Sequence, residues 1–207
     1  MTDQAPTRQR IMDAAQALVV SQGFSATTLD AILTHAGASK GAFFHHFASK
    51  DALGDAILER YAAADAEILD LYLAEAEDET DDPAQQIVSF VRLFEEAADG
   101  LATSVPGCLF VSFIYERGPD TVRGDDVIVG SIELWRARLL DKLTEAAKTR
   151  PELADVDLPA LADQVFTIFE GGFILGRATG EPSHLRRQLA HLRRYLTLLL
   201  GVEETVT

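Results

Sequence analysis

The sequence predicts an all-α protein in which a small N-terminal helical domain precedes a larger helical one. Apolar residues recur at three- and four-residue spacing along most of the 207 residues, which is the period of an amphipathic helix. Proline and glycine divide this pattern into about nine helical segments. No segment shows the strict alternation of apolar and polar residues that is typical of a strand.

Composition narrows the classes of protein that this chain can belong to. Its 47% hydrophobic and 25% charged residues are those of a soluble globular protein. No apolar run comes near the roughly 20 residues that cross a bilayer, and the N-terminus lacks the hydrophobic part of a secretion signal. We therefore expect a cytoplasmic protein with no membrane partner.

No pattern in the sequence predicts catalysis or a bound cofactor. We find no arrangement of nucleophile and base, no phosphate-binding loop and no metal-ligand spacing. The single cysteine, Cys108, rules out an intrachain disulfide and a cysteine-rich metal site. We expect a protein that is not an enzyme and needs no cofactor or metal.

The net charge of −15 is unevenly distributed. Residues 1–50 carry slightly more basic than acidic side chains, and nearly all of the acidic excess lies after residue 50. Phosphates attract the first part and repel the second. The charge distribution therefore favours a nucleic-acid partner for the N-terminal segment alone.

Residues 26–50 have the pattern of two short helices joined by a tight turn. Thr27, with Asp30 three residues later, predicts the capped start of the first helix. Gly37 can adopt the left-handed conformation that ends a helix, and Ser39 then caps the second. Two helices joined in this way form a helix-turn-helix, whose second helix docks in the DNA major groove.

Phe43 and Phe47 lie one turn apart and are expected to face inward, which leaves the polar side of the second helix outward. Donors on that side and at the starts of the helices suit phosphates and base edges, although they could also be ordinary surface. The predicted DNA contacts are Thr27, Thr28, Ser39, Lys40, Gly41, Ala42, Phe44, His45, His46 and Lys50.

This stretch, T-T-L-D-A-I-L-T-H-A-G-A-S-K-G-A-F-F-H-H-F-A-S-K, resembles the DNA-binding signature of TetR-type transcriptional regulators. The resemblance covers about the first quarter of the chain and implies a DNA-binding domain at residues 1–47 and an effector-binding and dimerisation domain at residues 48–207. It further implies a homodimeric repressor that a small apolar effector releases from a palindromic operator in double-stranded DNA. Phe44 stands where many members carry a tyrosine that touches the DNA backbone. The alternative is an all-α ligand-binding or adaptor protein without operator binding.

A long helix is expected to begin after Ser49, with one buried stripe that includes Ile68 and Leu71, and to fade in the acidic stretch 75–82. That stretch is predicted to be solvated. Pro83 starts the next helix, and the nearly all-apolar segment 108–115 is expected to be buried or to line a cavity.

The last two helices have leucines at coiled-coil spacing and paired glycines that would let another helix approach. They could form an internal hairpin or half of a four-helix dimer interface, and the family resemblance favours the interface. The predicted interface residues are Leu161, Val165, Ile168, Gly172, Gly176, Leu185, Leu189, Leu192, Leu196 and Leu199.

Aromatic residues concentrate after residue 88, where most are expected in the core and some around an apolar effector pocket. The predicted pocket residues are Phe90, Phe94, Phe110, Phe113, Trp135, Phe166, Phe169, Glu170 and Phe173. Glu170 could bind an effector or pair with Arg177 or a partner subunit. Cys108 is expected to be a small buried apolar residue, with a sensing role as the alternative.

Overall fold

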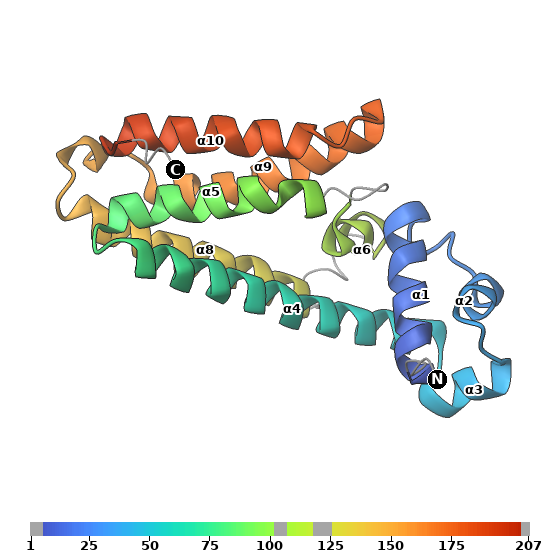
Figure 1. The fold of residues 1–207 in the computed structure, drawn as a ribbon. Coiled ribbons are helices and arrows are strands. Elements are labelled where there is room, and N and C mark those ends of the chain that lie inside the picture. Colours follow the sequence, from blue (N-terminus) through green and yellow to red (C-terminus); the bar gives the residue numbers. More distant parts are fainter. Residues whose placement is uncertain (1–5, 102–106, 118–125, 204–207) are drawn as a thin grey trace. The chain divides into compact units, whose positions relative to one another are not determined.

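The computed structural model describes residues 6–101, 107–117 and 126–203 (Figure 1). Within these ranges there are nine α-helices, one 3₁₀ turn and no strand, which confirms the all-α prediction. In chain order the elements are α1 (Thr7–Gln22), α2 (Leu29–Ala36), α3 (Lys40–His46), α4 (Lys50–Glu79), α5 (Pro83–Leu101), α6 (Leu109–Arg117), α8 (Asp126–Ala147), η1 (Pro151–Leu153), α9 (Leu158–Thr179) and α10 (His184–Leu200).

The chain forms two compact units. Among the described residues, the first groups 6–64 with 107–117 and 126–129, and the second groups 65–101 with 130–203. Helix α4 therefore begins in the first unit and ends in the second. The functional boundary expected after residue 47 stays a prediction, because the compact units divide the chain within α4 instead.

In the first unit, α1 contacts α2, α3 and α6. The apolar side of α1, including Ile11 and Ala15, is buried together with Phe43 and Phe47. Both phenylalanines face inward, as their spacing predicts. The core thus fixes which side of α3 remains exposed.

The end of α2 and the start of α3 lie at the predicted residues, but the start of α2 does not. Gly37 ends α2 in the left-handed conformation, with φ of 58°, and the Ser39 hydroxyl caps α3 by accepting from the Ala42 N–H. The predicted cap at Thr27 is wrong, since Thr28 is the N-cap of α2 and accepts from the Ala31 N–H. The N-cap lies one residue later than predicted, because the Thr27 side chain is buried and its hydroxyl donates to the Gly23 carbonyl.

Helix α4 does not keep a single buried stripe. Leu53 and Ile57 are buried as expected, but Ile68 and Leu71 are 37% and 59% exposed, and Leu69 is buried in their place. Because α4 contributes to both units, the side of the helix that is buried in the first unit need not be the side that is buried in the second. The prediction that Ile68 and Leu71 are core residues is therefore wrong.

The acidic stretch at the end of α4 is more structured than predicted. The helix continues to Glu79, and Ala76 is only 1% exposed. Glu77 pairs with Lys142 at 2.6 Å, and Glu79 pairs with Arg92 at 2.5 Å. Most side chains of the stretch are exposed, as the predicted solvation implies, and cations of α5 and α8 neutralise part of the charge.

The second unit has one continuous apolar core to which α4, α5, α8, α9 and α10 contribute. Helix α10 contacts both α5 and α9. Gly172 of α9 makes this approach close, because a Cβ built there would lie 2.8 Å from the Cα of Leu185. The close helix approach inferred from the glycines therefore occurs within one protomer.

Helix α9 corrects the expectation about apolar runs. Its 22 residues are long and apolar enough to cross a membrane by length and composition, with mean hydropathy 1.3 and 22% of the apolar window buried in the protomer. A core or interface helix of a globular protein passes the same test. Much of the apolar surface of α9 is therefore left uncovered by the protomer itself.

Candidate nucleic-acid interface and effector pocket

The outward side of α3 brings together most of the predicted DNA contacts. Buried Phe43 anchors the helix, while Phe44 is 52% exposed. Five further predicted contacts are exposed with it: Ser39, Lys40, Gly41, His45 and His46. Ala42 is half-buried, and the rings of His45 and His46 lie 4.9 Å apart. This arrangement presents donors and one aromatic face on a short, well-anchored helix.

The two threonines before α2 have different environments. Thr28 is exposed at the start of the helix. Thr27 is fully buried, and its hydroxyl donates to the Gly23 carbonyl at 2.7 Å and accepts from Gln22. Thr27 has no surface to offer a phosphate, so its assignment as a DNA contact is corrected. It holds the α1–α2 turn instead.

Lys50 is bound within the first unit. Its ammonium donates to the carbonyl oxygens of Phe24 at 2.8 Å and Thr27 at 3.0 Å, and lies 4.3 Å from the centre of the Phe24 ring. A cation at a helix N-terminus is unfavourable unless it finds acceptors, and these carbonyls supply them. A phosphate is therefore not needed to explain the position of Lys50, and its DNA contact stays a prediction.

The aromatic residues predicted to line a pocket fall into two groups. Phe110 and Phe113 belong to the first unit, where they pack on Tyr61 and Phe24. The second unit holds a continuous aromatic cluster in which neighbouring ring centres are 4.6 to 6.3 Å apart, formed by Tyr72, Phe90, Phe94, Trp135, Phe169 and Phe173. The predicted set is thus divided between the two units, and its role as an effector pocket stays a prediction.

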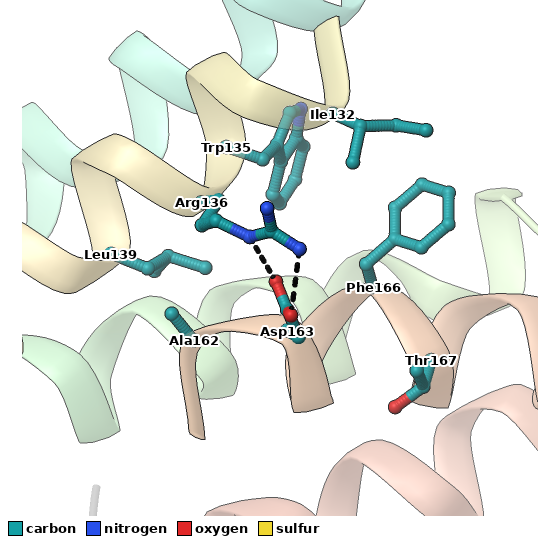
Figure 2. A pocket seen from close by; sticks show the side chains of 8 residues that line it. All are labelled: Ile132, Trp135, Arg136, Leu139, Ala162, Asp163, Phe166 and Thr167. Atoms are coloured by element: carbon teal, nitrogen blue, oxygen red, sulfur yellow. Dashed lines mark hydrogen bonds and ion pairs between the residues drawn. The ribbon is translucent and has the colours of Figure 1, made fainter. Parts of the chain in front are cut away.

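A pocket of about 210 Å³ lies between α8 and α9 beside this cluster (Figure 2). Trp135 and Phe166 give it aromatic walls, and Ile132, Leu139 and Ala162 add aliphatic ones. Phe166 is the one predicted pocket residue outside the cluster that lies here. Glu170 is half-buried on α9 but does not line this pocket.

An ion pair crosses the pocket in Figure 2. The guanidinium of Arg136 donates to both carboxylate oxygens of Asp163, at 2.6 and 2.8 Å. This two-pronged hydrogen bond lowers the pKa of Asp163 and raises that of Arg136. The pocket is therefore apolar with one fixed, charged edge.

On the other side of Trp135, its indole N–H donates to Asp65 of α4 at 2.7 Å. Burial raises the pKa of the Asp65 carboxyl, and the indole hydrogen bond partly opposes this shift. No ion pair joins Asp65 to a cation among the residues described here. Among the described residues, the Trp135 indole N–H is therefore the hydrogen-bond donor that stabilises the charged form of Asp65.

Comparison with known proteins decides the family. Residues 11–57 match the family model described as bacterial regulatory proteins of the tetR family, and residues 83–192 match the tetracyclin repressor-like C-terminal domain. The chain belongs to the TetR family. It is a DNA-binding transcriptional regulator, as its helix-turn-helix predicts.

Relatives of this TetR-family chain cover most of its length. It is 29% identical to the transcriptional regulator AcuR of Cereibacter sphaeroides over 88% of this chain and 82% of AcuR. It is 24% identical to the transcriptional repressor DhaR of Mycobacterium sp. (strain GP1), over 82% and 81% of the two chains. The crystal structure of a regulatory protein TetR from Rhodobacter sphaeroides has a TM-score of 0.75 and 27% identity, over 91% of this chain and 98% of that one. These relatives are regulators and not enzymes.

The predicted dimer residues of this TetR-family chain lie inside the protomer. Eight of them are buried in the single chain: Leu161, Val165, Gly172, Gly176, Leu185, Leu189, Leu192 and Leu196. Ile168 and Leu199 are half-buried. Contacts with α5 and α9 of the same chain account for the leucine spacing of α10, and the assignment of these residues to a dimer interface stays a prediction.

Sequence reasoning missed the polar contacts that join distant parts of the chain. Asp65 lies 70 residues from Trp135, and Asp163 lies 27 residues from Arg136. Neither carboxylate stands in a motif. An acidic residue on the apolar side of a predicted helix was the signal available for Asp65, which lies three residues before Ile68 of the expected stripe. Cys108 is buried as expected, with its sulfur 4.0 Å from the Tyr61 hydroxyl.

Proposed function

We propose that the protein is a cytoplasmic, homodimeric repressor that binds a palindromic operator through the outward side of α3 and leaves it when a small effector binds. The exposed row on α3, anchored by buried Phe43, carries the DNA-binding part of this proposal. In a dimer, the two α3 helices must meet successive major-groove faces about 34–36 Å apart. An effector acts by favouring a conformation with a different spacing.

A different part of α9 and α10 supports the dimer. Ile174 of α9 and Leu198 of α10 are 54% and 74% exposed, and Tyr195 is 47% exposed. A Cβ built at Gly171 would meet nothing within 4 Å inside the protomer. We propose that this exposed side of the two helices, rather than the leucine seam, contacts the second subunit.

We propose that the effector occupies the pocket of Figure 2 and the adjoining aromatic cluster. The pocket volume of about 210 Å³ is below the ~300–1,000 Å³ of typical drug-sized sites, so it suits a compact apolar molecule. Because α4 is one continuous helix that ends in the second unit and begins in the first, it offers a route by which this site can influence α3.

Operator binding is tested with the palindromic DNA beside the protein's own gene, by fluorescence anisotropy at several salt concentrations. We expect sequence-specific binding whose logarithmic salt slope is steep, at about −0.9 per phosphate neutralised. Lys40→Ala should weaken binding to all sequences and reduce the slope by about one. Lys148→Ala, at an exposed position after α8, is the matched control and should change neither. Binding by the wild type that is flat in salt and indifferent to sequence would refute the proposal.

A further inference from the structure

The turn between α1 and α2 is held from two directions. On one side is Lys50 of α4, whose ammonium donates to the carbonyl oxygens of Phe24 and Thr27. On the other side is α6, which Figure 1 shows beside α1 and which comes from a part of the chain about 90 residues away. Since this turn leads directly into the helix-turn-helix, whatever holds it also holds α2 and α3.

Glu116, near the end of α6, supplies a hydrogen bond to this turn. Its carboxylate Oε2 accepts from the backbone N–H of Ser25 at 2.5 Å. Backbone N–H groups bind a carboxylate more strongly than a neutral acceptor, because the bond is charge-assisted. Gly23 makes room for it, since a Cβ at that position would collide with the other carboxylate oxygen. Gly23 also has φ of +88°, which disfavours any side chain there.

An aromatic contact lies beside this hydrogen bond. The rings of Phe24 and Phe113 are 4.8 Å apart, and Phe113 is fully buried. A Cβ at Gly54 of α4 would lie 2.9 Å from Phe24 and 3.4 Å from Phe113. The α1–α2 turn, α4 and α6 therefore meet at one tightly packed point.

The chain order gives α6 a special place among the elements of the first unit. It follows α5 and precedes α8, and both α5 and most of α8 belong to the second unit. The start of α6 packs on α4, where Phe110 and Tyr61 have ring centres 4.8 Å apart. Its end binds the α1–α2 turn. Helix α6 thus reaches both supports of the helix-turn-helix.

We propose that Glu116 is a positioning residue for operator binding. It ties the α1–α2 turn to α6, so that α6, and not α4 alone, sets the orientation of α3. This inference rests on the proposed operator binding. The hydrogen bond from Ser25 to Glu116 should also slow hydrogen exchange of the Ser25 amide, and this effect can be measured without DNA.

Three substitutions test the tie. Glu116→Ala removes the acceptor, Glu116→Asp keeps the charge but is one methylene too short, and Glu116→Gln keeps an acceptor oxygen at the same reach. Glu59→Ala, at an exposed glutamate of α4, is the matched control. Amide hydrogen exchange of the full-length protein, followed by NMR, gives the local readout, and anisotropy with the operator gives the functional one.

We expect at least tenfold faster exchange of the Ser25 amide in the Ala and Asp variants, with the core amide of Ile11 unchanged. Operator affinity should fall at least fivefold in both. Glu116→Gln keeps an acceptor without the charge, so both readouts should lie between those of wild type and Glu116→Ala. Glu59→Ala should stay within about twofold of wild type in both readouts. Unchanged exchange at Ser25, or unchanged operator affinity despite faster exchange, would overturn the inference. If wild type itself binds no operator, the proposed function fails, and the exchange data still decide whether the tie exists.

Discussion

The ammonium of Lys50 lies 2.8 Å from the carbonyl oxygen of Phe24 and 4.3 Å from the centre of its ring. One side chain at the start of α4 thus binds both the backbone and the aromatic face of a residue in the α1–α2 turn. A hydrogen bond from a charged group contributes about 1.5–3 kcal/mol, and a cation–π contact adds about 0.5–1 kcal/mol at an exposed site. This contact is therefore large relative to the stability of a small domain.

Lys50→Ala should act mainly through stability. We expect the midpoint of thermal unfolding to fall by several degrees, because two carbonyls lose their donor. The salt slope of operator binding should change by less than one unit, since the ammonium is already occupied inside the protein. Differential scanning calorimetry and salt-dependent anisotropy measure the two effects. A full one-unit change in slope with an unchanged midpoint would show instead that Lys50 contacts a phosphate.

Because Asp65 is buried, the difference in free energy of unfolding between wild type and Asp65→Asn should depend on pH. The folded protein raises the pKa of this carboxyl by burial, so its contribution to stability is fully present below the unfolded pKa of about 3.9 and is lost as pH rises through the folded value. Asparagine keeps an oxygen for the Trp135 N–H but does not titrate. The variant should therefore gain stability relative to wild type as pH rises from the unfolded pKa through the raised folded pKa of Asp65.

Denaturant unfolding of both proteins at a series of pH values measures this difference. Asp65→Ala is the informative companion, because it leaves the Trp135 N–H without its acceptor and should be about 1–3 kcal/mol less stable than Asp65→Asn at every pH. A difference between wild type and the asparagine variant that is constant with pH would contradict the raised pKa.

The helix-turn-helix was predictable because its signals are local. Gly37, Ser39, Phe43 and Phe47 lie within 11 positions of one another, and helix ends and faces follow from such short patterns. The one displaced cap arose because two adjacent threonines are equivalent in sequence. Only the core distinguishes buried Thr27 from exposed Thr28.

Contacts between distant segments were not predictable. Leucine spacing shows that α10 needs a partner helix, but it cannot show whether that helix comes from the same chain. Ile68 and Leu69 are equally apolar, and only the position of the second core decides which of them is buried. Glu116 and Ser25 are 91 residues apart, and nothing near either residue announces the hydrogen bond.

Two adjacent glycines of α9 should respond oppositely to alanine. At Gly172 the new Cβ would lie 2.8 Å from backbone of Leu185, so α9 and α10 must separate, at a cost of about 1–3 kcal/mol. At Gly171 the protomer offers open space, and alanine is favoured over glycine in a helix by up to about 1 kcal/mol. Thermal unfolding at protein concentrations below the dimer dissociation constant, where the proposed dimer contact near Gly171 is absent, should show a lower midpoint for Gly172→Ala alone. Equal behaviour of the two variants would contradict the close packing of α10 on Gly172.

The dimer face predicts a contrast between two exposed leucines. Leu198 of α10 is 74% exposed and lies on the proposed interface, whereas Leu71 of α4 is 59% exposed and lies outside it. An arginine at position 198 of each subunit would be an unpaired charge in an apolar interface, which costs about 2–5 kcal/mol. Leu198→Arg should therefore raise the dimer dissociation constant at least about a hundredfold, and Leu71→Arg should leave it unchanged. Sedimentation velocity across a dilution series measures both constants.

Operator affinity should fall with the Leu198→Arg substitution only, because one helix-turn-helix meets only half of a palindrome. A Leu198→Arg protein that remains dimeric at the wild-type concentration would place the interface elsewhere on the chain.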